Sequence, residues 1–388
     1  MRGPRLIGRV PSTRPHVLLV TPPATPPWHN GTTLLARHLA ASAVDFHYRL
    51  LGVRRQAAPG PFSEVEPVFG AAPRGGWRDQ ARVFARLLKP DRCSVHLFMF
   101  SPHGKAVRAI RGALTLNRKR SVHTMPSQPA DGADPQQLSF ADKTVVLCEA
   151  SALRLRSAGL EGVEVVRPGV PIPAAPADTM ASRARLAIAR PDLDWGDAPV
   201  FVYAGDLEFS DGARVFVEAA RLVADAVPGV RFALACRPKT PAAALVADGL
   251  QRRVERMGLG DAVRFLGVVD DMPALLGAAT AVALPVDTLY AKVDLPIVLL
   301  EAMALGTPTV VSDLPSLSEL AGLGQGTRVV KRSDPEALAT TLCALAESAS
   351  TVARLGRGAR ATVQSHFRLD AMAASYEAIY RDLGVHDA

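Results

Sequence analysis

Short apolar runs alternate with longer segments of helical hydrophobic spacing along the whole chain. The runs expected to form strands are 16–20, 94–100, 143–148 and 163–166 in the first half, and 199–205, 230–236, 263–267, 281–285 and 307–313 in the second. Helix-length segments include 32–42, 211–226, 241–257 and 333–348. Continuous apolar strands separated by helices are typical of parallel sheets with both faces covered. The pattern predicts an α/β protein with two doubly wound domains.

A proline-rich segment, RPGVPIPAAPADT at 167–179, separates the two halves and shows no hydrophobic period. Such a composition favours a stiff connector. The chain of 388 residues also exceeds one ordinary core and fits two domains. We therefore expect an N-terminal domain over 1–170 and a C-terminal domain over 171–365. Long loops are expected at 55–76 and 126–139, and an amphipathic helix is expected at 365–384.

Composition places the chain among folded globular proteins, with 48% hydrophobic and 21% charged residues. No apolar run approaches a membrane span, and the first residues lack the apolar centre of a secretory signal. We therefore expect a cytoplasmic protein. The four cysteines, far apart in apolar segments, are expected to be reduced core thiols: Cys93, Cys148, Cys236 and Cys343.

The formal net charge of +8 is compatible with anionic substrates, nucleic acid or an anionic membrane face. The basic residues of the first half lack the interleaved aromatic residues that stack bases, so no nucleic acid partner is expected. A solvated basic surface is the simpler interpretation. Peripheral contact with the anionic inner face of a membrane is left open as an alternative.

One carboxylate, Glu301, lies inside an otherwise almost wholly apolar stretch, KVDLPIVLLEAMALGTP at 292–308. Asp294 is a good helix N-cap, Pro296 fits the first turn, and Gly306 provides a stop. The helix between them is apolar on nearly every side and is therefore expected to be buried. A buried carboxylate must find hydrogen-bond donors or lose its charge. Glu301 therefore needs a partner.

The stretch DLPIVLLEAMALGTPTVVSDLPSLSEL resembles the signature region of glycosyltransferase family 4, also called glycosyltransferase group 1. Members are retaining nucleotide-sugar transferases of the GT-B fold, in which two Rossmann-like domains face each other across a cleft. The resemblance extends through VRFLGVVDDMPALLGAATAVALP and ADKTVVLCEASALRLRSAGLEGVEVVRPGVPI to SYEAIYRDL. It covers the chain from about residue 141 onward. It implies an N-terminal acceptor-binding domain, a C-terminal nucleotide-sugar-binding domain, and a final helix (366–388) that crosses back to the first domain.

The resemblance implies that Glu301 hydrogen-bonds the ribose hydroxyls of the donor nucleotide, whereas a Glu paired with a core Arg is the alternative. Leu295 and Pro296 lie at the expected helix start, whose free N–H groups suit a donor phosphate. The family usually has a second Glu eight residues before the first, but Val293 occupies that position. The adjacent Asp294 lies on the same helix face as Glu301 and is a candidate for the sugar contacts. A plain N-cap role for Asp294 is equally open.

Three further positions match the family in outline. Asn30 and Gly31, at a predicted helix start, resemble the glycine loop that faces the donor diphosphate, although Gly31 alone also suits a simple turn. His123 is near a strand end, where the fold often places a residue that contacts sugar or acceptor; a surface or core histidine is the alternative. Val268, next to Gly267, matches a turn whose backbone recognises the base.

The phosphate region departs from the family. The usual Gly-Arg and Lys-Gly pairs after the first strand of the second domain are replaced by GDLEFSDG at 205–212. Gly205 is retained, but Asp206 and Asp211 occupy the cationic positions and would repel a diphosphate. We expect Arg237 and Lys292 to replace the missing cations, with Lys239 a weaker candidate. Asp206 is expected to cap the following turn or to orient Arg237; loss of donor binding is the alternative.

The resemblance implies sugar transfer from a nucleotide-diphosphate sugar to an acceptor hydroxyl with retention of configuration, as in polysaccharide or glycoconjugate biosynthesis. The acceptor would be a glycan, a lipid-linked sugar or a small molecule. No cofactor or metal is expected, and the Asp192 and Asp194 pair is interpreted as a cap or solvated turn. Two alternatives stay open: a nucleotide-sugar epimerase of the same architecture, and a catalytically inactive GT-B module that binds a nucleotide sugar or assembles with an active partner.

Overall fold

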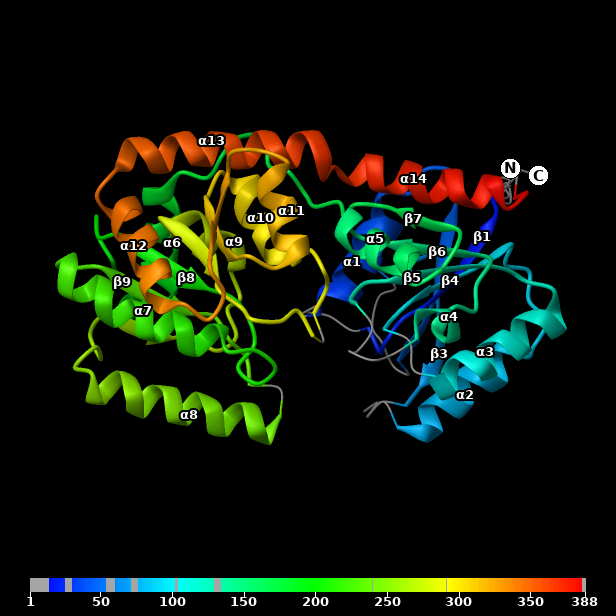
Figure 1. The fold of residues 1–388 in the computed structure, drawn as a ribbon. Coiled ribbons are helices and arrows are strands. Elements are labelled where there is room, and N and C mark those ends of the chain that lie inside the picture. Colours follow the sequence, from blue (N-terminus) through cyan, green and yellow to red (C-terminus); the bar gives the residue numbers. More distant parts are fainter. Residues whose placement is uncertain are drawn as a thin grey trace, which may run out of the picture.

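The chain forms two parallel sheets, each flanked by helices, that lie side by side (Figure 1). The computed structural model describes residues 14–24, 30–53, 60–70, 76–101, 104–128, 134–238, 240–290 and 292–385. All strand pairs in both sheets are parallel. The prediction of two doubly wound α/β domains is therefore confirmed.

The N-terminal sheet has the strand order β3-β2-β1-β4-β5-β6-β7. Its strands are β1 (His16–Val20), β2 (His47–Val53), β3 (Glu64–Phe69), β4 (Val95–Met99), β5 (Arg120–Met125), β6 (Lys143–Val146) and β7 (Val163–Val165). The helices of this half are α1 (Gly31–Ser42), α2 (Trp77–Leu87), α3 (Gly104–Asn117), α4 (Pro135–Leu138) and α5 (Glu149–Ser157). The strand order reverses between β1 and β4, as in a Rossmann-like fold.

The C-terminal sheet has the order β10-β9-β8-β11-β12-β13, with its reversal between β8 and β11. Its strands are β8 (Val200–Tyr203), β9 (Arg231–Leu234), β10 (Val263–Phe265), β11 (Ala281–Leu284), β12 (Thr309–Ser312) and β13 (Thr327–Val330). The helices are α6 (Thr179–Ala189), α7 (Gly212–Ala226), α8 (Pro241–Arg256), α9 (Met272–Ala278), α10 (Ile297–Leu305), α11 (Pro315–Gly322), α12 (Pro335–Ala346), α13 (Ala349–His366) and α14 (Leu369–Asp382), with a 3₁₀ turn η1 (Pro191–Leu193).

The chain crosses between the two halves twice, and the crossings lie against each other. The proline-rich connector passes Gly169 and Val170, and the Val170 N–H donates to the Phe367 carbonyl at 3.0 Å. Phe367 and Arg368 separate α13 from α14, so the predicted single helix at 365–384 is interrupted there. Figure 1 shows the two helices running along one side of the whole molecule. The two crossings therefore meet between the domains.

Helix α14 is fixed to the N-terminal half by buried polar contacts. The Tyr376 and Thr124 hydroxyls are 2.8 Å apart, and Tyr380 meets the Tyr48 hydroxyl at 3.1 Å. The Glu377 carboxylate accepts from two backbone N–H groups of the loop after α1. The final helix therefore packs on the first domain although it follows the second in sequence.

Several smaller predictions can be compared with the structure. The expected loop at 55–76 was wrong in part, because it contains β3, an edge strand with alternating polar positions and a proline. The four cysteines are free thiols, as expected. Asp192 pairs with Arg190, and both Asp192 and Asp194 are exposed around η1, which confirms the solvated turn.

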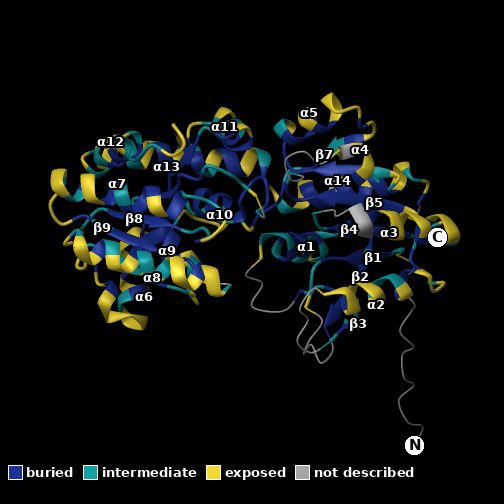
Figure 2. Cartoon of the chain, turned by 60° about the horizontal axis from the view of Figure 1, so that its bottom comes forward, coloured by how far each residue is buried: buried dark blue, intermediate teal, exposed yellow. Residues whose placement is uncertain are grey.

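Burial follows the layers, with dark blue sheets and exposed residues on the outer faces of helices such as α2, α3 and α8 (Figure 2). Within the described part of the chain, no helix is both long and apolar enough to cross a membrane.

Candidate functional site

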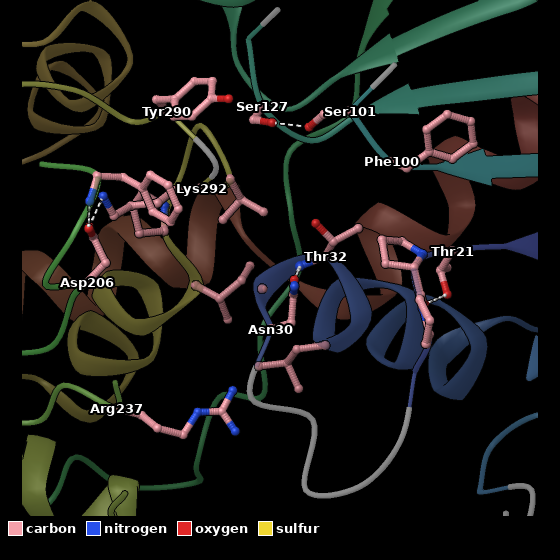
Figure 3. Close-up of a pocket in the computed structure, with 18 of the residues that line it drawn as sticks. Thr21, Asn30, Thr32, Phe100, Ser101, Ser127, Asp206, Arg237, Tyr290 and Lys292 are labelled. Atoms are coloured by element: carbon pink, nitrogen blue, oxygen red, sulfur yellow. Dashed lines mark hydrogen bonds and ion pairs between the residues drawn. The ribbon is translucent and has the colours of Figure 1, made fainter. Parts of the chain in front are cut away.

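A cavity of about 1240 Å³ lies between the two domains, at the carboxyl ends of their strands. Loops that follow β1, β4 and β5 line it on one side, and loops that follow β8, β9 and β10 line it on the other. These loops include those next to both strand-order reversals, where open α/β sheets bind ligands. Figure 3 shows the start of α1 opposite side chains of the second domain across this space.

Glu301 lies on α10 and faces this cavity. The helix begins at Ile297 with Pro296 as its N-cap, so the predicted start at Asp294 was wrong. Its C-cap Gly306 has φ 86°, in the left-handed region, as the predicted stop requires. The rest of α10 is mostly buried, and among the described residues Glu301 has no hydrogen-bond or ion-pair partner. Burial raises the pKa of Glu301 to about 7. The hydrogen-bond donors that the sequence predicts for Glu301 would therefore have to come from a ligand.

Asp294 is turned away from the cavity. Its carboxylate accepts from the Gln128 N–H at 3.1 Å and from the Ser151 hydroxyl, and its own N–H donates to the Pro126 carbonyl at 2.8 Å. These partners all belong to the N-terminal domain. Burial raises the pKa of Asp294 to about 7. The structure therefore contradicts both sequence interpretations, sugar contact and helix cap, because Asp294 joins the two domains instead.

His123 is also absent from the cavity wall. It is fully buried in β5, where its Nε2 is 3.0 Å from the Phe100 carbonyl and its ring is 4.4 Å from the ring of Phe140. Burial lowers the pKa of His123 to about 4, so the ring is neutral. The structure favours the core-histidine alternative. Its contribution to the site is indirect, since Phe100 does line the cavity.

Asn30 and Gly31 are placed as expected, at the N-terminus of α1 and in the cavity wall. The Asn30 side chain caps the helix by accepting from the Thr32 N–H at 2.9 Å. A Cβ on Gly31 would come within 3.1 Å of the Val293 side chain, so a glycine allows the domains to approach here. The positive end of the α1 dipole opens toward the cavity, which favours an anion.

The acidic residues after β8, Asp206 and Asp211, each form an ion pair with a basic side chain. Asp206 forms an ion pair with Lys292 and accepts from the N–H groups of Glu208 and Phe209, which confirms its predicted role as a turn cap. Burial alone would raise the pKa of Asp206, but the ion pair with Lys292 and these hydrogen bonds hold it below its usual range. Asp206 does not orient Arg237, so that alternative was wrong. The Asp211 carboxylate is paired with Arg214 at 3.0 Å.

The two cations predicted to bind phosphate, Lys292 and Arg237, differ in whether a carboxylate already pairs with them. Lys292 lines the cavity, but its ammonium group is already held by Asp206 (Figure 3). Arg237 is exposed after β9, reaches into the same space, and has no acidic partner among the described residues. Arg237 is thus the cation available to a ligand. Lys239 lies outside the described residues.

The remaining donor-site candidates separate into two groups. Gly205, Pro296 and Val268 line the cavity, and Val268 is 49% exposed beside Gly267 with φ 65°. Leu295 is buried and does not line it. No group of three or more His, Cys, Asp or Glu residues that could hold a metal occurs in the described ranges.

Sequence reasoning missed polar residues that the N-terminal domain contributes. Ser101 follows β4 and Ser127 follows β5; their hydroxyls are hydrogen-bonded to each other in the cavity wall (Figure 3). Tyr290 lines the opposite side with Phe209, their ring centroids 5.9 Å apart. Each serine lies two residues after the end of a strand, and this position was the available signal, since strand ends gather at one edge.

Comparison with known proteins identifies the C-terminal half most clearly. Residues 198–348 match the family model of glycosyl transferases group 1. A D-inositol 3-phosphate glycosyltransferase of Streptomyces griseus is 29% identical over 225 residues, which are 57% of this chain and 44% of that protein. The lipopolysaccharide core biosynthesis mannosyltransferase LpcC of Rhizobium leguminosarum is 33% identical over 138 residues, 35% of this chain and 38% of that protein. The chain thus spans less than half the length of these curated relatives.

Solved structures resemble the whole chain. Anabaena HepE in complex with UDP-glucose has a TM-score of 0.76 at 18% identity, covering 94% of this chain and 99% of that one. Sucrose-phosphate synthase from Thermosynechococcus elongatus has a TM-score of 0.75 at 18% identity, covering 95% and 99%. Residues 198–348 are thus similar to the glycosyl transferases group 1 family, and the chain as a whole has the GT-B fold.

Proposed function

We propose that the protein transfers a sugar from a nucleotide-diphosphate sugar to an acceptor hydroxyl, with retention of configuration and without a metal ion. The observation that carries the proposal is Glu301, a carboxylate on the wall of an interdomain cavity that has no partner among the described residues. Its family position and its unmet need for donors both favour the two hydroxyls of a ribose. HepE, whose structure was solved with UDP-glucose, has the same fold.

The charged groups of the cavity suit the rest of such a donor. Arg237, which has no acidic partner among the described residues, would pair with the diphosphate, and the α1 N-terminus offers N–H groups to the same anion from the other domain. The exposed Val268 and the backbone after β10 line the same cavity, and we assign them to the base. Positioned cations and N–H groups stabilise the departing diphosphate as the sugar acquires oxocarbenium character.

In this mechanism the leaving phosphate accepts the proton of the acceptor hydroxyl, so no protein nucleophile is required. That feature agrees with the positions of Asp294 and His123, which are both turned away from the cavity. Asp294 is not placed to act as the carboxylate base of a nucleotide-sugar epimerase, and the family model that residues 198–348 match is one of glycosyl transferases. We therefore favour transfer over epimerisation.

The test is a donor panel of common UDP-, GDP-, ADP- and TDP-sugars incubated with the purified chain. Release of nucleoside diphosphate above the buffer rate is expected with at least one donor, and abolished release is expected for Glu301→Ala. Once an acceptor is found, proton NMR of the product should show the anomeric configuration of the donor. Binding of a nucleotide sugar without any release would instead support an inactive binding module, and release of an epimerised nucleotide sugar would support the epimerase.

A further inference from the structure

The part of the cavity that lies in the N-terminal domain has an apolar wall. Helices α2 and α3, the end of β3 and the residue after β4 contribute Phe69, Trp77, Val83, Phe84, Phe100 and Ile110. Val83, Phe84 and Phe100 are half-buried and pack against the same apolar cluster that includes Ile110. Trp77, at the start of α2, is 73% exposed. An exposed tryptophan beside a continuous apolar wall marks a binding surface.

Charges near this wall are engaged with each other. Asp79 on α2 lines the cavity, but its carboxylate is paired with Arg82 at 3.1 Å. Arg86, one turn further, is paired with Asp91 at 3.0 Å. Arg37 on α1 has a partner as well. Among the described residues that line this end of the cavity, no charged side chain lacks a partner, whereas Arg237 and Glu301 lack one at the other end. Arg78, which does not line the cavity, lies over the Trp77 ring at 5.5 Å.

The volume is sufficient for two ligands. Pockets for a single small ligand usually measure roughly 300–1,000 Å³, and this cavity measures about 1240 Å³. The nucleotide sugar would occupy the charged C-terminal end. The hydroxyls of Ser101 and Ser127 lie between that end and the apolar wall. A second ligand would thus meet polar groups first and apolar groups beyond them.

We propose that this wall binds the apolar part of an amphipathic acceptor, whose hydroxyl head group lies near Ser101 and Ser127. The inference rests on the proposed transferase function and specifies its acceptor class. An anionic acceptor would meet no unpaired cation among the described residues that line this wall. A fully polar glycan would stack on Trp77 but would place hydroxyls against the aliphatic side chains of Val83 and Ile110. An uncharged head with an alkyl or aromatic body fits both features.

Alkyl glucosides below their micelle concentrations provide the probe, because the chain length changes while the head stays constant. Octyl β-glucoside should bind the full chain at least about tenfold more tightly than methyl β-glucoside, since burial of two methylene groups alone gives that factor. Calorimetry measures both ligands without requiring a donor.

Matched variants on α3 locate the binding. Ala109 is exposed and lines the cavity, so Ala109→Glu places a charge against the wall without disturbing the core. It should weaken octyl glucoside by roughly tenfold or more and leave methyl glucoside unchanged. Leu116 is exposed on the same helix but does not line the cavity, and Leu116→Glu should change neither affinity. Trp77→Ala provides a second variant with the same expected direction.

Equal affinity for octyl and methyl glucoside would overturn the inference, as would equal losses in the Ala109 and Leu116 variants or binding only above the micelle concentration. The donor panel is read separately, as nucleotide release without alkyl glucosides. Turnover of a donor without an alkyl preference would refute this inference alone. Tighter binding of octyl glucoside that is lost in Ala109→Glu, without turnover of any donor, would refute the proposed function and leave the apolar site.

Discussion

Replacing Glu301 by Gln is expected to stabilise the ligand-free protein at neutral and alkaline pH. The folded-state pKa of Glu301 is raised from 4.5 to about 7 by burial. In the unfolded chain the carboxyl ionises near 4.5, so the folded state holds the proton more tightly between these values. Stability is therefore lost as pH rises from about 4.5 to 7 and stays low above it. The full shift corresponds to about 3 kcal/mol, which Gln avoids because it carries no charge.

Thermal unfolding of the C-terminal domain between pH 4.5 and 8.5 measures this effect. Near pH 8 the melting temperature of Glu301→Gln should exceed that of the wild type by roughly 6–12 °C, and the two should converge near pH 4.5. Asp270→Asn is the matched control, because Asp270 lines the same cavity but is exposed. A pH-independent difference, or an equal gain in the Asp270 variant, would refute the claim that Glu301 is held without a partner.

Three further substitutions probe the cavity and its frame. Asp206→Asn keeps an acceptor for the turn but frees Lys292, so nucleoside diphosphate affinity should rise by roughly twofold to fivefold; unchanged or weaker calorimetric affinity would count against this. Asp294→Ala leaves the Gln128 N–H unpaired between the domains and should increase the radius of gyration in solution scattering and weaken nucleotide binding; unaltered curves and affinity would contradict it. Asp91→Asn, in a buried cluster with three basic side chains, should lower stability by about 3–5 kcal/mol in urea without changing nucleotide affinity, and a loss of affinity would show that the cluster supports the site.

Much of the fold was readable from the sequence because central strands are continuous apolar runs. Runs such as 281–285 and 199–205 fall in the middle of the C-terminal sheet, where both faces are covered. The predicted runs omitted the edge strands β3 and β13, which keep polar or exposed residues, and also two internal strands, β2 and β5, in which polar residues interrupt the apolar pattern. Gly306 could be predicted as a helix stop because only a glycine adopts its left-handed backbone without strain.

A site residue could be predicted where its side chain requires a particular partner. It was harder to predict where the role depends on which way the side chain points. Glu301 could be identified because a carboxylate in an apolar helix requires donors. Asp294 was misassigned because the helix begins at Ile297, three residues later than expected, which turns the Asp294 side chain toward the other domain. His123 was misassigned because its strand-end position does not reveal on which face of the sheet the side chain lies.

The contribution of the first 140 residues could not be read in detail. Their match to the family is general, and Trp77 becomes a neighbour of the cavity only through the packing of α2 against β3 and α3. Asp206 and Lys292 are far apart in sequence, so their ion pair could not be predicted, and both Lys292 and Arg237 were expected to bind phosphate. Of these two cations, Arg237 is the one without an acidic partner among the described residues.

The central claim is that one cavity binds a nucleotide diphosphate, with Arg237 on the phosphates and Glu301 on the ribose. Calorimetric affinities of a nucleoside and its diphosphate, measured for wild type, Arg237→Ala and Glu301→Gln, test it most directly. The wild type should prefer the diphosphate, Arg237→Ala should lose most of that preference while keeping nucleoside affinity, and Glu301→Gln should weaken both ligands alike. The same diphosphate preference and the same affinities in all three proteins would contradict the account.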